Sequence, residues 1–237
     1  MAKKSAEPDR KARIEQMRRE QEAADRRRTL LVVGSAVLVI VVLAGIVTKV
    51  VLDAVADKDI TRVGVSAAAA SCDAVLTDAA AASGTAVHVG PGTNKPTVSK
   101  VAYPMIPPDN GEHFANPVYP AAEFYTAQDR PPLENLVHNL EHGYTVLWYT
   151  SATPKAQQDQ LKKISTLARK DEKAAGKFIV SAWDDARGAF PAGKTIGISH
   201  WGAKTGYRQL CGGVSGAAIK KFIDAYPYTD SPEPNGQ

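Results

Sequence analysis

Two histidines four residues apart, with a glutamate beside the second, are the residues of this sequence best suited to chemistry. They lie in the stretch VHNLEHG, from Val137 to Gly143. On an α-helix, residues four apart share one face, so His138 and His142 would present two imidazoles to one ligand. Neutral imidazole binds Zn, Cu, Fe and Ni. The spacing alone leaves two interpretations open, a metal site and a pair of solvated helix residues with His142 near the C-terminal end of the helix dipole, and by itself it does not favour the metal site.

The same residues match the H-x-x-E-H pattern of inverted zinc peptidases, in which the glutamate activates a water molecule. A match of five residues is weak, and such peptidases need a distant third ligand and a larger fold that this sequence does not supply. The peptidase is therefore the least favoured of the functions considered. The sequence assigns no catalytic residue, and we expect a binding domain rather than an enzyme.

A short amphipathic helix is predicted to carry the two histidines. Pro132 suits its first turn, Gly143 suits its end, and apolar residues recur at i, i+3, i+4 and i+7. These apolar positions are Leu133, Leu136, Val137 and Leu140. His138 and His142 fall on the opposite side, so we expect their imidazoles to lie outside the core.

The segments around this helix alternate between strand and helix patterns. A strand is expected from Thr97 to Tyr103, followed by an ordered loop. After the helix, YTVLWYT, KFIVSAW and TIGISHW read as strands, and PKAQQDQLKKISTLARK and SGAAIKKFIDAYP read as helices. This order predicts an α+β domain with a mainly antiparallel sheet and packed helices.

Two separated motifs resemble a known family. The segment YPMIPPDNGEHF contains a PP-x-x-G-x-H element, and LENLVHNLEHGYTVLWY contains a VH-x-LEHG element. Over roughly residues 85 to 225 the chain is similar to the domain-of-unknown-function family numbered 3105, whose members often carry one N-terminal transmembrane helix. The resemblance implies that His113, His138, Glu141 and His142 occupy signature positions. It implies no reaction, because the family has no established activity.

Three histidines brought together by a loop and a helix would form a site for Cu or Zn with an open coordination position. We predict His113, His138 and His142 as the ligands, with Glu141 as a fourth ligand or as the group that orients an imidazole. His88 is a further candidate ligand. The alternative is a structural or interaction domain in which a hydrogen-bonded His–Glu network holds the loop 104–131 onto the helix.

His200, in ISHWG between two predicted strands, is expected to be a structural residue packed near Trp201. Cys72 and Cys211 are the two cysteines of the chain. Neither lies in a CxxC pair or near a histidine in sequence, so a disulfide is favoured over a thiolate nucleophile or a metal ligand.

The stretch from Leu30 to Val47 is uncharged and almost wholly apolar. With the following residues it reaches the roughly 20 residues that span a bilayer, which predicts a transmembrane helix over 29–52. Arg26, Arg27 and Arg28 precede it, so the positive-inside rule places the N-terminus in the cytoplasm and the C-terminal domain outside the cell membrane. A signal peptide cleaved after Ala56 is the alternative.

The basic character of the chain belongs to its N-terminal tail. Residues 1–28 contain ten Lys and Arg against six Asp and Glu, which leaves 19 of each sign beyond them. The tail mixes charges and has no aromatic residue to stack on bases, so nucleic acid is not expected as a partner. The expected partners are the lipid bilayer and a membrane or extracytoplasmic protein.

These patterns divide the chain into five segments. We predict a cytoplasmic basic tail over 1–28, a transmembrane helix over 29–52 and an Ala-rich stalk over 53–87. An extracytoplasmic α+β domain over 88–228 and a flexible tail over 229–237 follow.

Overall fold

The structure is a computed structural model and describes residues 6–56, 58–81 and 83–237. The chain divides into two compact units, with the boundary after Ala56. The first five residues of the predicted basic tail lie outside the described residues, as do Asp57 and Ala82 of the predicted stalk.

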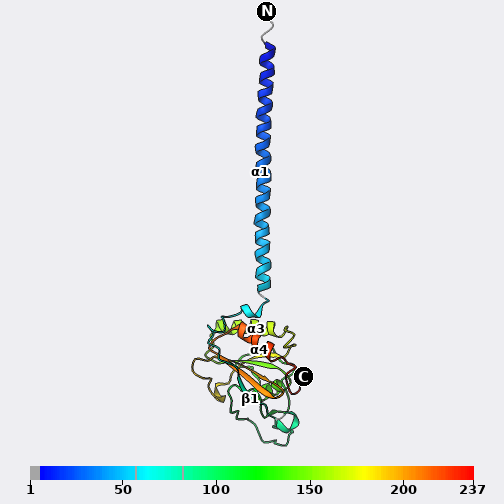
Figure 1. Cartoon of the computed structure of the whole chain (residues 1–237). Coiled ribbons are helices and arrows are strands. Elements are labelled where there is room, and N and C mark those ends of the chain that lie inside the picture. Colours follow the sequence, from blue (N-terminus) through cyan, green and yellow to red (C-terminus); the bar gives the residue numbers. More distant parts are fainter. Residues whose placement is uncertain (1–5, 57, 82) are drawn as a thin grey trace, which may run out of the picture. The chain divides into compact units, whose positions relative to one another are not determined.

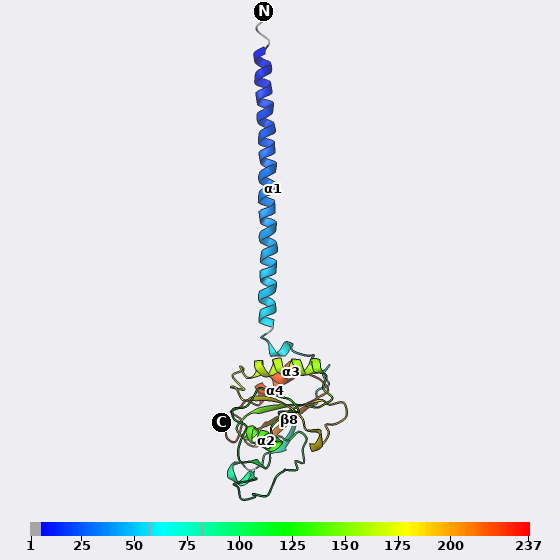
Figure 2. The same cartoon turned by 180° about the vertical axis from the view of Figure 1, so that it is seen from behind.

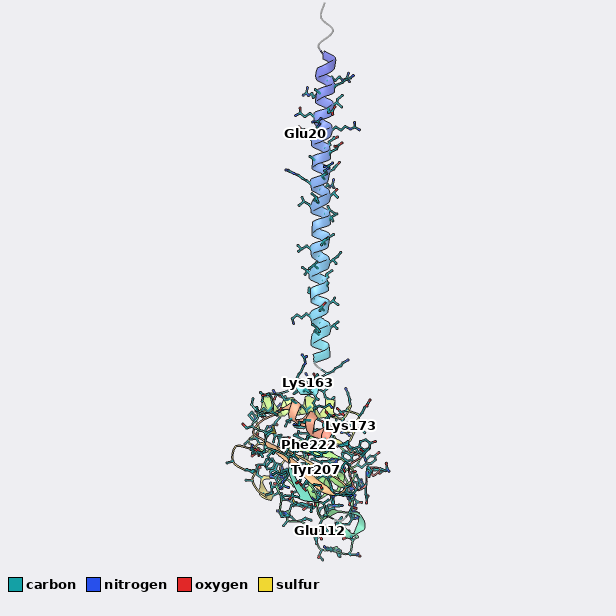
Figure 3. The ribbon with its side chains drawn as sticks, viewed as in Figure 1. Glu20, Glu112, Lys163, Lys173, Tyr207 and Phe222 are labelled. Atoms are coloured by element: carbon teal, nitrogen blue, oxygen red, sulfur yellow. A yellow bond between two sulfur atoms is a disulfide. The ribbon has the colours of Figure 1, made fainter. Side chains whose placement is uncertain are left out.

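The first unit is one continuous helix, α1 (Ala6–Ala56), of 51 residues. In Figure 3 its side chains, Glu20 among them, project to both sides of the ribbon. The part Arg10–Leu52 contains an 18-residue window with a mean hydropathy of 3.1 and is long and apolar enough to cross a membrane. Helix α1 is therefore a candidate membrane span, and a signal sequence near an N-terminus would pass the same test of length and composition.

The second unit is an α+β domain, as the sequence predicts. Its α-helices are α2 (Leu133–Glu141), α3 (Lys155–Ala168) and α4 (Gly216–Ala225). Three short 3-10 helices are η1 (Ile60–Arg62), η2 (Gly84–Val87) and η3 (Asp185–Arg187). The strands are β1 (Leu76–Ala79), β2 (His88–Val89), β3 (His113–Phe114), β4 (Phe124–Tyr125), β5 (Thr145–Tyr149), β6 (Phe178–Ala182), β7 (Ile196–Trp201) and β8 (Thr205–Cys211).

Six strands form the main sheet in the order β1-β8-β7-β5-β6-β4. The pairs β1–β8, β8–β7 and β7–β5 are antiparallel, whereas β5–β6 and β6–β4 are parallel. The parallel pair β5–β6 follows from the intervening helix α3, because a crossover connection brings the chain back in the same direction. The sheet is mainly antiparallel, in agreement with the prediction.

Helices cover both faces of this sheet (Figures 1 and 2). Alternate residues of β5 point to opposite faces, so Leu147 belongs to the core beneath α3 and α4, and Trp148 belongs to the core beneath α2. Phe222 of α4, labelled in Figure 3, is fully buried in the first of these cores. The apolar side of α2 packs in the second core, so the face of the helix that carries His138 is turned away from the sheet.

The segment predicted to be an Ala-rich stalk belongs, from residue 58 onward, to the α+β unit. Ile60 and Val63 are buried beside α4, and Leu76–Ala79 form the edge strand β1 against β8. Cys72 and Cys211 are joined by a disulfide bond, with a Cα–Cα distance of 4.0 Å. The prediction failed because a low content of large apolar residues conceals several buried side chains and a strand whose partner lies far along the chain.

Two further expectations are corrected. No strand forms from Thr97 to Tyr103, a segment held instead by side chains: the N–H of Val101 donates to Glu134 (2.8 Å), and the hydroxyl of Tyr103 donates to the carbonyl of Glu112 (2.7 Å). Residues 229–237 were expected to be flexible, yet they pack against the domain. Lys177 Nζ donates to the carbonyls of Pro234 and Gly236 at 2.8 Å each.

Candidate metal centre

Two histidines of the candidate site are placed by a short parallel ladder. Strand β2 pairs with β3 so that His88 lies opposite His113, and Val89 lies opposite Phe114. Directly paired residues on neighbouring strands point to the same face. The ladder therefore sets the two imidazoles side by side, with ring centroids 5.0 Å apart.

Helix α2 supplies the other two side chains. His138 and Glu141 are three residues apart and lie on the side of the helix that meets β3. The helix ends at Glu141, and Gly143 stops it two residues later with a φ of +86° that is readily adopted only by glycine. The predicted short helix and its stop are therefore both present.

The expectation that these imidazoles lie outside the core is wrong. Only 3% of His138 and 8% of His142 is exposed, and Glu141 is fully buried. Strand β3 and the C-terminal segment cover this side of α2: His138 contacts the carbonyl of Phe114, and His142 contacts that of Gln237. Helical periodicity identifies the face that packs on the sheet, but it does not show that loops cover the other face.

Four donor atoms converge where α2 meets the β2–β3 ladder. His88, His113, His138 and Glu141 each offer one ligand atom, and these four atoms lie within 4.8 Å of one another. Glu141 Oε2 is 3.1 Å from His113 Nε2 and 3.7 Å from His88 Nε2. Such spacing suits side chains that share one ion, because each metal–ligand bond is roughly 2 Å long.

Backbone carbonyls fix which nitrogen of each ring is available. Nδ1 of His113 donates to the carbonyl of Gly111 at 2.8 Å, and Nδ1 of His138 donates to that of Phe114 at 2.7 Å. A carbonyl oxygen only accepts hydrogen bonds, so the hydrogen lies on Nδ1. In a neutral ring, Nε2 then carries the lone pair, as it does in metal-bound histidines held by an outer partner.

Three of the four converging atoms lack a hydrogen bond. Among the described residues, His88 Nε2, His113 Nε2 and Glu141 Oε2 are buried without a hydrogen-bond partner. The 3.1 Å approach between His113 and Glu141 is not aligned as a hydrogen bond. Leaving buried polar atoms unsatisfied costs roughly 1–3 kcal/mol each. A cation between these atoms would satisfy all three at once.

The protonation states also suit a cation. Burial lowers the pKa of His138 to about 4 and, together with the neighbouring His113, lowers the pKa of His88. Burial acts to raise the pKa of Glu141, but His113 and the Gly84 N–H, which donates to Oε1 at 2.7 Å, hold it below its usual value. Near neutral pH the site therefore presents a carboxylate at Glu141 and neutral imidazoles at His88 and His138, the forms that bind metal.

His142 was predicted as one of three histidine ligands, but its donor atom belongs to a neighbouring group. Glu141, His142 and Glu233 offer atoms within 4.8 Å of one another, with His142 Nε2 3.4 Å from Glu233 Oε2. Glu141 is common to both groups. Sequence reasoning missed Glu233 because it lies in the segment 229–237, which has no periodic pattern.

His200 has a structural environment. It is fully buried, Nδ1 lies 3.2 Å from the hydroxyl of Thr145, and Nε2 lies 2.7 Å from the carbonyl of Asp230. Both ring nitrogens are thus occupied by protein groups. Trp201, the next residue, points to the opposite face of the sheet and meets the edge of His113 at 5.6 Å between ring centroids.

Comparison with protein families gives one match. A family model described as "Protein of unknown function (DUF3105)" matches residues 94–237. The matched part contains His113, His138, Glu141, His142 and Glu233, and His88 precedes it. No curated protein and no solved structure matches the chain.

Proposed function

Because the chain belongs to the DUF3105 family, whose function is unknown, we propose a function from its own residues: binding of one transition-metal ion by His88, His113, His138 and Glu141. The observation that carries the proposal is the convergence of three imidazole nitrogens and one carboxylate oxygen, three of them buried without a hydrogen-bond partner among the described residues. A site built only for stability would satisfy these buried atoms with hydrogen bonds.

The donor set favours Zn²⁺ or Cu²⁺. Imidazole nitrogen with one carboxylate oxygen is a common zinc environment and also suits Cu²⁺. The group contains no thiolate or thioether, the ligands that select Cu⁺. Cys72 and Cys211 are joined to each other and are not available as ligands.

The test is metal content of the full chain, purified in detergent without a polyhistidine tag. After dialysis against Zn²⁺ or Cu²⁺, we expect at least one tightly held ion per chain by elemental analysis. Glu141→Gln keeps the size of the side chain but removes its charge, and it should lower the affinity of this site by at least tenfold. Glu172→Gln, an exposed substitution with the same change of charge, serves as the control.

A purely structural His–Glu network is the competing explanation. It gains support if the dialysed chain holds neither metal while Glu141→Gln lowers thermal stability.

Peptidase chemistry is less favoured than ion binding. The glutamate of the H-x-x-E-H pattern must act on a water beside the substrate. Glu141 is fully buried, and its Oε1 already accepts the N–H of Gly84. Peptide hydrolysis by the zinc-loaded chain that Glu141→Gln abolishes would support a peptidase instead.

We further propose that α1 anchors the chain in the cell membrane with the α+β unit outside, where a disulfide persists. Reporter fusions after Ala56 and at the C-terminus would test this arrangement. Cytoplasmic signal from either fusion would exclude it. The bilayer is then one partner, and an extracytoplasmic or membrane protein that receives or delivers the ion is the other partner we propose.

A further inference from the structure

The neighbouring group of donors, Glu141, His142 and Glu233, has features of its own that point to a second ion. His142 Nδ1 donates to the main-chain oxygen of Gln237 at 2.8 Å, which leaves Nε2, 3.4 Å from Glu233 Oε2, as the ring atom available to a ligand. His138 Nδ1 donates to Phe114 in the same way, and if both rings are neutral the Nε2 lone pairs of His138 and His142 face each other across 3.1 Å. Two lone pairs at this distance repel unless a proton or a cation lies beside them.

The two carboxylates of this group also repel each other unless a cation lies near them. The donor atoms of Glu141 and Glu233 lie within 4.8 Å of each other, and Glu141 Oε2 is buried with no hydrogen-bond partner among the described residues. The nearby ammonium of Lys177 is engaged with the carbonyls of His142, Pro234 and Gly236. A cation bound between the carboxylates and His142 would offset their repulsion.

The C-terminal segment is shaped to hold these donors in place. The N–H of Glu233 donates to the carbonyl of Glu141 at 3.0 Å. Gly236 packs against the ring of His142 so closely that a Cβ there would lie 2.4 Å from Cγ of the imidazole. Only glycine fits at this approach, so the C-terminal segment can lie directly against the ring.

We propose that Glu141, His142 and Glu233 bind a second divalent cation beside the first, with the carboxylate of Glu141 shared between the two positions. This inference rests on the proposed function, because Glu141 would be shared by two ions. The inner ion is the one proposed for His88, His113, His138 and Glu141, and the outer ion is the one proposed here. The outer position is the more open: the side chain of Glu233 is 42% exposed, whereas those of His113 and Glu141 are fully buried. The outer position should also bind its ion more weakly, because the inner ion already offsets the charge of Glu141.

The test is a Zn²⁺ titration of the full chain in detergent, without a polyhistidine tag, in competition with a chelator of known affinity. We expect two equivalents of zinc, the second bound at least tenfold more weakly. Glu233→Gln keeps the side-chain size and the backbone contact with Glu141. It should abolish the second equivalent and change the affinity for the first by less than threefold. Glu172→Gln should retain both equivalents.

The outcomes separate the two proposals. If the chain binds no zinc, both proposals fail. If it binds one equivalent, and Glu233→Gln binds one equally well, the inner site stands and the second position is overturned. If it binds two equivalents and Glu233→Gln also binds two, the second ion lies elsewhere and the inference is again overturned.

Discussion

His88 and His113 are direct partners in the parallel ladder between β2 and β3, although they lie far apart in the sequence. The ladder is only two residues long. It nevertheless places one imidazole at the rim of the candidate metal centre and the other in its fully buried interior, because the side chain of His88 is 17% exposed and that of His113 is 0% exposed. The two histidines should therefore respond differently to substitution.

We expect His88→Ala to weaken zinc binding by more than the roughly 10–100-fold seen when an orienting partner of a ligand is lost. The thermal stability of the metal-free chain should change little, because the rim position opens to water. His113→Ala should weaken zinc binding and also destabilise the metal-free fold, because it leaves a cavity against Trp201. Chelator-competition titrations and thermal unfolding with EDTA would measure both effects. Wild-type affinity in His88→Ala would remove it from the ligand set.

Gly143, at the end of α2, should tolerate no side chain. Its φ is +86°, and a Cβ would lie 2.4 Å from the carbonyl oxygen of Tyr228. Gly176 has nearly the same φ of +85° but open space around it, so it is a matched control. We expect Gly176→Ala to cost about 1 kcal/mol from backbone strain alone. Gly143→Ala should cost clearly more, because the C-terminal segment must also move. Equal losses in urea unfolding would show that the close approach has no energetic effect.

The stability of the domain should fall as the solution is acidified. Burial lowers the pKa of His200 below its usual value of 6.5, so the folded chain keeps this ring neutral while the unfolded chain protonates it. The stabilising contribution is present above about pH 6.5 and is lost as the pH falls toward the folded pKa. One such group changes the free energy of unfolding by at most about 1.4 kcal/mol per pH unit.

The comparison that isolates this effect is urea unfolding at pH 7.5 and pH 5.5, in EDTA, for the wild type and His200→Gln. His88 and His138 also have lowered pKa values and add to the wild-type slope. Between pH 7.5 and pH 5.5 the free energy of unfolding should fall less in the variant than in the wild type, whatever the absolute stability of the variant. An unchanged slope would mean that His200 does not titrate differently in the folded and unfolded chains.

The Cys72–Cys211 disulfide should be a main source of stability, since it closes a loop across a sequence separation of 139. Loop-closure entropy predicts that the double variant Cys72→Ser, Cys211→Ser loses roughly 4 to 5 kcal/mol. Urea unfolding of both chains would measure the loss. Mass spectrometry after alkylation should show no modified cysteine until reductant is added, and two modified thiols without reductant would disprove the bond.

The sequence by itself determined the features that depend on local pattern. Apolar spacing predicted α2, α3 and α4 and the strands β5, β6 and β7 with small errors at their ends. A long uncharged stretch predicted the candidate membrane span within α1. These predictions succeeded because helix and strand periods are written in neighbouring residues. The two family motifs likewise identified His113, His138 and Glu141, which the structure brings together.

Only the tertiary structure decided which residues complete the two groups of donors. His88 reaches the first group through a pairing of distant two-residue strands, and Glu233 reaches the second through the C-terminal segment that folds back onto α2. The burial of His138 and the direction of its Nε2 depend on a carbonyl of β3. Strand register and loop packing of this kind are set by contacts between distant parts of the chain, so no short stretch of sequence specifies them.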